Sequence, residues 1–140
     1  MRVCLRAMLV FACLQVSADD VQLPLTDTPG RTEEGEKIFH DRNLGHCLLC
    51  HSLSASAGTF QGTLAPSLDD VGSRLSAGQI RFRIVDQSRL NQATTMPPYF
   101  RFDRLNQVAA EFQNSPVLTA QQIEDLVAYL GSQQQREIAR

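Results

Sequence analysis

The chain has 140 residues, of which 43% are hydrophobic and 20% charged, with a formal net charge of −2 and no tryptophan. This length suits one small domain and is too short for two ordinary ones. The slightly acidic balance, without a basic stripe, argues against nucleic acid as a partner.

Residues 1–18 have the pattern of a cleavable export signal. A charged start contains Arg2 and Arg6, an apolar run follows at 7–14, and the small residues Val-Ser-Ala end at a cleavage point after Ala18. The apolar run is far too short to span a bilayer. We therefore expect export to the periplasm.

An alternative for this segment is lipid attachment at Cys13, because the preceding Val-Phe-Ala loosely resembles a lipobox. The bulky Phe11 makes that match poor, so cleavage after Ala18 is the better prediction. Cleavage also removes Cys4, which leaves two cysteines, eleven basic and fifteen acidic residues, and a formal charge of −4. The mature chain would then have no structural disulfide and no spare thiol for nucleophilic catalysis.

Residues 19–31 contain two prolines and a glycine without helical periodicity, which predicts an extended lead-in to the domain. A first helix is expected near Thr32, because this residue can cap it and the two glutamates that follow favour the positive end of the helix dipole. The helix should run out by residues 43–45. His40, near its end, is predicted to lie on the surface.

The sequence Cys-Leu-Leu-Cys-His at 47–51 comes next. Two cysteines three residues apart, with a histidine directly after the second, are the attachment pattern of c-type haem. Cys47 and Cys50 can both reach the vinyl groups of one haem, and His51 would supply the proximal iron ligand. A zinc site would need two more ligands, and no cysteine or histidine follows His51. A thioredoxin-like dithiol would follow a strand of a βαβ pattern, which is not seen here.

Residues 52–67 are rich in serine, alanine, glycine and threonine and are expected to form a loop along one edge of the haem. Pro66 would fix a corner, and its carbonyl is a natural acceptor for the second imidazole N–H of His51, which would orient the ring. A simple turn proline remains the alternative on the sequence alone.

Ser76 is the expected N-cap of a helix that runs to about Asp86 and carries its apolar residues on one side. Arg81 and Arg83 are predicted to belong to a solvated face of this helix. The alternative is that one of the two arginines pairs with a haem propionate.

Met96 lies in a loop at 91–100 and is followed directly by Pro97 and Pro98. It is the only methionine that remains after removal of the signal. Because c-type cytochromes often pair histidine with methionine, Met96 is the predicted distal iron ligand. The alternative is a core methionine that fills a gap. Two axial ligands leave the iron no vacancy, so electron transfer is the predicted role.

Two later segments have helical patterns. Apolar residues at 105–112 have the spacing of a short amphipathic helix. A clearer helix should begin after Thr119, which forms a capping box with Gln122, and end near Gly131. Its apolar stripe consists of Ile123, Leu126, Val127 and Leu130.

The domain is therefore predicted to span residues 32–132, with a polar tail at 133–140. No segment has the alternating pattern of a useful strand. The predicted fold is all-α, wrapped around one covalently bound haem.

Five motifs in order resemble the SoxX family of sulfur-oxidation cytochromes: CLLCH, APSLDDVGSRL, IVDQSRLN, TTMPPYF and LTAQQIEDLVAYL. The resemblance covers nearly all of the mature chain. It implies a class I cytochrome c-like fold, haem attachment to Cys47 and Cys50, and iron ligation by His51 and Met96. One departure is Ala65, where related cytochromes usually have glycine.

The resemblance also implies a function. SoxX pairs with SoxA, a larger haem subunit, in a periplasmic complex that oxidatively joins thiosulfate to a cysteine of the SoxYZ carrier, an L-cysteine S-thiosulfotransferase reaction. This chain would accept the released electrons and pass them to another cytochrome. The alternatives are a stand-alone soluble electron-shuttle cytochrome c and a ligand-binding cytochrome with an open iron.

Overall fold

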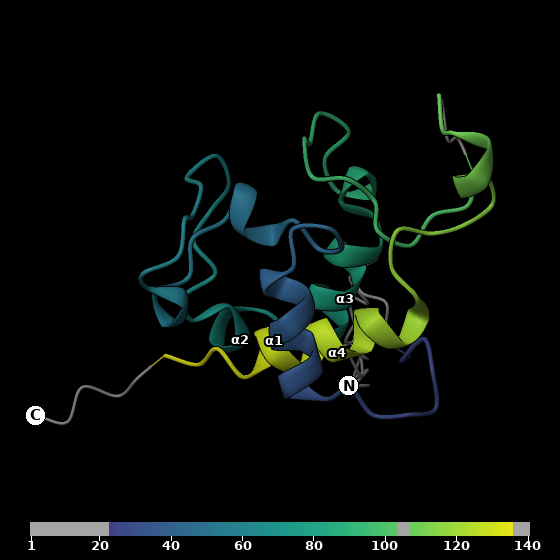
Figure 1. Cartoon of the computed structure of the whole chain (residues 1–140). Helices are drawn as coiled ribbons and strands as arrows, with labels where there is room; N and C mark the ends of the chain where they lie inside the picture. The colour runs from purple at the N-terminus through teal and green to yellow at the C-terminus, as the bar shows by residue number, and fades with distance from the viewer. Residues whose placement is uncertain (1–22, 104–106, 136–140) are drawn as a thin grey trace, which may run out of the picture.

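The computed structural model describes residues 23–103 and 107–135, and within these ranges the chain forms helices, turns and loops without a β-strand (Figure 1). The predicted all-α fold is confirmed. The predicted export signal at 1–18 lies outside the described residues. Within them, every helix is too short or too polar to cross a membrane.

Short helices and single 3₁₀ turns make up the regular structure. The helices are α1 (Thr32–His40), α2 (Val71–Arg74), α3 (Ala77–Asp86) and α4 (Ala120–Gly131). The 3₁₀ turns are η1 (Cys47–Leu49), η2 (Ser54–Ser56), η3 (Gln87–Arg89) and η4 (Ala110–Phe112). α4 is the central element, because it packs against α1, α2 and α3.

The hydrophobic core lies where α1 and α3 meet α4. Its most deeply buried large side chains are Phe39, Leu53, Leu118, Ile123 and Leu126. Three of them come from α4 or the residue before its cap, so the last helix supplies much of the core. The predicted apolar stripe of this helix is buried, as expected for a face turned toward the core.

α1 and α4 cross in backbone contact (Figure 1). A Cβ atom at position 35 would overlap the backbone oxygen of Asp125, and it would also lie 2.7 Å from Cβ of Tyr129. Only glycine has no side chain to place there. Gly35 therefore permits the close approach of the first and last helices.

The predicted N-cap at Ser76 and the predicted capping box at Thr119 are both present, and Ser76 also forms a capping box with Gln79. At α3, the Gln79 backbone N–H donates to Ser76 Oγ at 3.1 Å, and the Ser76 backbone N–H donates to Gln79 Oε1 at 3.0 Å. At α4, the corresponding bonds between Gln122 and Thr119 measure 3.2 and 2.8 Å. These bonds satisfy backbone donors that a helix leaves unpaired in its first turn.

α1 differs from its prediction at both ends. The helix begins at Thr32, but its N-cap is Arg31 and no side chain caps it. It ends at His40, several residues before the predicted end. His40 is half-buried rather than on the surface, because its Nε2 lies 3.1 Å from the hydroxyl of buried Ser56.

The amphipathic helix predicted at 105–112 is wrong for its described residues. Only the η4 turn forms there, and Phe112 is 59% exposed. Leu105 lies outside the described residues. A short helix is stable mainly through the packing of its apolar face, and here the exposed Phe112 has no such packing.

The prediction that Arg81 lies on a solvated face is also wrong. Its guanidinium is buried and makes two parallel bonds to the Glu124 carboxylate, from Nε at 2.7 Å and from Nη2 at 2.8 Å. The sequence pattern indicated that only one face of α3 is buried. In the structure more of the helix surface is buried, so the charged Arg81 side chain is buried as well and pairs with a residue of α4. Arg83 is half-buried and donates from Nη1 to Gln79 O at 3.0 Å.

The lead-in before α1 is fastened to the same region of α4. The Leu25 N–H donates to Glu124 Oε1 at 2.9 Å, and the Arg31 N–H donates to Asp125 Oδ1 at 2.8 Å. The two neighbouring carboxylates therefore bind one arginine and two backbone amides, which joins α3, α4 and the lead-in.

Replacing Arg81 with methionine is expected to destabilise the haem-loaded protein by about 3–5 kcal/mol, because the buried Glu124 carboxylate loses its cation. Denaturant unfolding measures the change. Lys37→Met is the control, because Lys37 pairs with Glu34 at an exposed site and should contribute far less. Equal losses in the two variants would contradict the importance of the buried pair.

Candidate haem site

A cavity of about 430 Å³ opens between the Cys-Leu-Leu-Cys-His motif, α3 and the loop that contains Met96. Cys50, His51, Pro66 and Met96 all line it, although they come from three separate segments of the chain. The size is in the range of sites for small organic groups. The fold therefore brings four of the five predicted site residues to one space.

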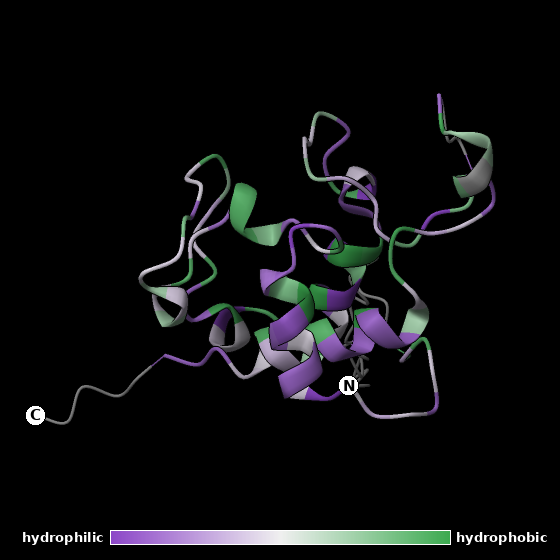
Figure 2. Cartoon of the chain, viewed as in Figure 1, coloured by the Kyte–Doolittle hydropathy of each residue, from purple (hydrophilic) through white to green (hydrophobic). Residues whose placement is uncertain are grey.

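The fifth residue, Cys47, begins the η1 turn, which is hydrophobic throughout (Figure 2). The His51 N–H donates to Cys47 O at 2.9 Å, which places these two residues one turn apart. Cys47 packs against the hydrophobic core, and burial raises the pKa of its thiol to about 12. Cys50 instead faces the cavity.

His51 makes the hydrogen bond expected from the sequence, with Nδ1 2.7 Å from Pro66 O. A carbonyl oxygen can only accept, so Nδ1 carries the proton. This fixes the tautomer and leaves Nε2 as the nitrogen with a free lone pair. The ring is thereby prepared to bind a metal through Nε2.

Met96 lies in a loop that is anchored on α3. The Tyr99 N–H donates to Ile84 O at 3.2 Å, and the Phe100 N–H donates to Val85 O at 3.3 Å. Met96 itself is partly buried against the core, and its N–H donates to Thr94 Oγ1 at 3.1 Å. Its position is therefore fixed from both sides of the two prolines.

Tyr99 is a site residue that the sequence analysis missed. It is buried, and its hydroxyl donates to Gly45 O, two residues before Cys47. Burial raises the pKa of Tyr99 well above its usual range, so the phenol stays protonated and can donate. This bond ties the Met96 loop to the segment that leads into the haem motif. A tyrosine in the MPPYF motif gave no local indication of a partner so distant in sequence.

The cavity lining fits a haem. Most of the lining is apolar, but Arg74, Arg83 and Gln87 also reach it. Gln87 Oε1 is buried and has no hydrogen-bond partner among the described residues. Because amide orientation is assigned from partners, the Gln87 side chain can turn either its oxygen or its NH₂ toward a polar edge of a bound group. A large apolar body with polar edges, such as haem with its propionates, matches this lining.

The model of the family "Cytochrome c" matches residues 32–134. The chain therefore belongs to the cytochrome c family, in which haem c is bound covalently, and this confirms the fold class predicted from the sequence.

A more particular likeness comes from a solved structure. The chain is similar to a chain in the crystal structure of SoxXA from P. pantotrophus, at 34% sequence identity and a TM-score of 0.77. The match covers 84% of this chain and 91% of that one. No curated protein sequence matches the chain. The predicted resemblance to the SoxX family is confirmed by this structural match.

Tyr99→Phe is expected to cost about 1–3 kcal/mol of stability, because Gly45 O would lose its buried donor. Denaturant unfolding of the haem-loaded protein measures this loss. Tyr129→Phe is the comparison variant, since it removes the hydroxyl of another buried tyrosine, which bonds to Ser56, but leaves the Gly45 contact intact. A Tyr99→Phe variant as stable as the wild-type protein would show that the bond contributes nothing.

Proposed function

We propose that the chain is a monohaem cytochrome c in which Cys47 and Cys50 carry the haem and His51 and Met96 ligate its iron. The observation that carries this proposal is that Cys50, His51 and Met96 line the same cavity. The hydrogen bond from His51 Nδ1 to Pro66 O supports it further, because it leaves Nε2 for the metal.

The haem supplies a one-electron couple between ferric and ferrous iron. The chain's own residues hold the group and set its environment. His51 and Met96 would both ligate the iron, and a methionine ligand would favour a higher reduction potential. The apolar part of the lining would shield a bound haem from water. These roles suit electron transfer without substrate binding at the metal.

We propose further that this cytochrome is the electron-accepting subunit of a SoxXA-type complex. The identity of 34%, extending over most of both chains, supports this role over that of a stand-alone shuttle. The partner would be a SoxA-type haem subunit, and the two chains together would act as an L-cysteine S-thiosulfotransferase. The described cysteines are Cys47 and Cys50, so the haem attachment would use both and leave no nucleophile among them.

The proposed reaction joins thiosulfate to a cysteine thiol of a SoxYZ-type carrier. Forming this S–S bond releases two electrons and the thiol proton. One haem takes one electron at a time, so this chain would accept them in succession and pass each to a downstream cytochrome. The complex would work in the periplasm, after cleavage behind Ala18, which agrees with haem attachment outside the cytoplasm.

Met96→Ala is expected to keep the haem covalently bound but to open an iron position. The ferrous variant should then bind carbon monoxide, and its reduction potential should fall on the order of 0.1 V, within the ~0.8 V range that axial ligands span. Absorption spectra and a redox titration measure both effects. Thr95→Ala, which alters the neighbouring cavity residue, is the control. Unchanged carbon monoxide binding and potential would remove Met96 from the ligand set.

Native purification tests the partner. The tagged protein, isolated from the periplasm of its own host grown on thiosulfate, should elute with a larger haem-staining chain in a stoichiometric ratio. The pair should become reduced when thiosulfate and the carrier protein are added. A red, reducible protein that elutes alone at moderate salt would favour the stand-alone shuttle.

A further inference from the structure

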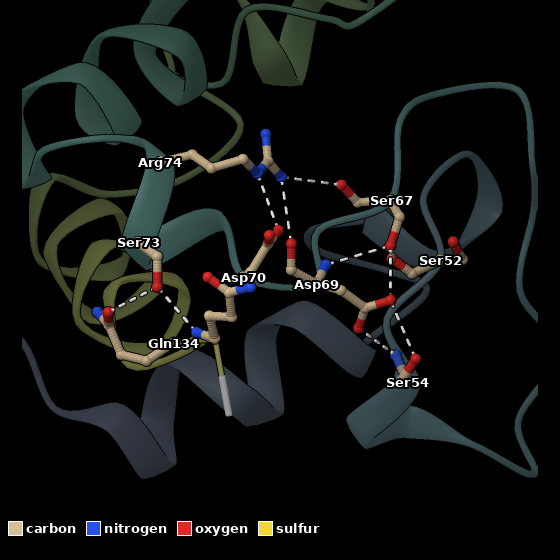
Figure 3. Close-up of polar contacts among 9 residues, drawn as sticks. Ser52, Ser54, Ser67, Asp69, Asp70, Ser73, Arg74 and Gln134 are labelled. Carbon is tan, nitrogen blue, oxygen red and sulfur yellow. Dashed lines mark hydrogen bonds and ion pairs between the residues drawn. The ribbon is translucent and has the colours of Figure 1, made fainter. Parts of the chain in front are cut away.

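Asp69 lies where the segment after His51 meets the segment after Pro66 (Figure 3). Its Oδ1 accepts from the Ser54 N–H at 2.7 Å. Its Oδ2 accepts from Ser54 Oγ at 3.0 Å and from Ser67 Oγ at 2.8 Å. One carboxylate therefore binds both segments, close to the two residues that form the imidazole–carbonyl bond.

The same two segments are joined at successive points along their length. The Ala65 N–H donates to Cys50 O at 2.9 Å, and the Leu68 N–H donates to Ser52 O at 2.9 Å. The bond between His51 and Pro66 lies between these two. The Asp69 carboxylate closes the end of this series, beyond Ser52.

Arg74 of α2 holds the Pro66 corner from the other side (Figure 3). Its Nη2 donates to Ser67 O at 3.3 Å and to Asp69 O at 3.2 Å. Its Nε pairs with Asp70 Oδ1 at 2.8 Å. The backbone around Asp69 is therefore fixed independently, which lets the carboxylate act as a rigid point of attachment for the 52–54 segment.

The carboxylate is well suited to this task because it is ionised. The Ser54 backbone N–H, followed by the Ser67 hydroxyl, holds the pKa of Asp69 below its usual range. An ionised carboxylate offers only acceptors, so it can receive three donors at once. Asp69 keeps all three bonds at neutral pH.

We propose that Asp69 is a positioning residue for His51: its carboxylate holds the Pro66 carbonyl at bonding distance from His51 Nδ1 and thereby tunes the haem iron. This inference rests on the proposed ligation of the iron by His51. A strong bond from Nδ1–H raises the basicity of the imidazole as a ligand. A more basic ligand favours ferric iron, so loosening the corner raises the reduction potential.

The test compares three variants of the haem-loaded full chain. Asp69→Ala removes all three acceptor bonds, and Asp69→Asn keeps an acceptor for the Ser54 N–H. Asp70→Asn is the matched control, because it also removes one negative charge but keeps an Oδ1 acceptor for Arg74 Nε and leaves the Asp69 bonds in place. Asp70 has a positive φ of 56°, which asparagine tolerates well.

Two readouts report on the imidazole rather than on stability. NMR measures solvent exchange of the His51 Nδ1 proton, which should become about tenfold faster in Asp69→Ala, whereas Asp70→Asn should leave it unchanged. A redox titration should show a higher reduction potential for Asp69→Ala than for Asp70→Asn. We expect the equilibrium constant for one-electron reduction to differ about threefold, which is about 28 mV at 59 mV per tenfold change. Asp69→Asn should lie between them.

Exchange and potential that move no more in Asp69→Ala than in Asp70→Asn would overturn the proposal, even if Asp69→Ala lowers the melting temperature. If Asp69→Ala yields no haem-loaded protein, the milder Asp69→Asn carries the same comparison with Asp70→Asn. A wild-type protein whose spectra lack histidine ligation would instead refute the proposed haem site, so the two failures are distinguishable.

Discussion

The backbone contact between α1 and α4 is the constraint on which the rest of the described structure depends. Helices this short have little stability of their own, so each needs a surface to pack against. Gly35 lets the first helix settle directly on the last, and α3 then packs against α4 and joins it through the buried pair of Arg81 and Glu124. This three-helix core supports the loops that form the cavity.

The residues that would bind the haem lie on or beside loops, and side-chain bonds to the backbone fix these loops. Tyr99 reaches Gly45 O, His51 reaches Pro66 O, and Asp69 reaches the Ser54 N–H. The first bond links segments 54 residues apart in sequence, and the other two link segments 15 residues apart. These hydrogen bonds set the distances between loop segments that have no regular secondary structure.

The sequence predicted the features that depend on neighbouring residues. The N-cap at Ser76 and the capping box at Thr119 are local, and so is the haem motif, whose spacing is set by one turn of chain. The role of the Pro66 carbonyl could also be anticipated, because a corner soon after the motif has to pass close to the histidine. These parts of the fold and of the site can be predicted from the sequence alone.

The missed features depend on what packs from elsewhere. Arg81 was predicted to lie on the surface because its partner, Glu124, is 43 residues away in sequence. The role of Tyr99 in the site was missed because the carbonyl that it binds lies 54 residues before it. Phe112 had the spacing of an amphipathic helix, but its side chain is exposed and has no apolar surface to pack against.

The long sequence separations in this fold also bear on how the cavity forms. α4 supplies Leu130 to the lining and also packs against α1, so the lining is complete only when the last helix is in place. Contacts of high sequence separation slow folding, and a chain whose lining is still incomplete leaves room for a bulky group to enter.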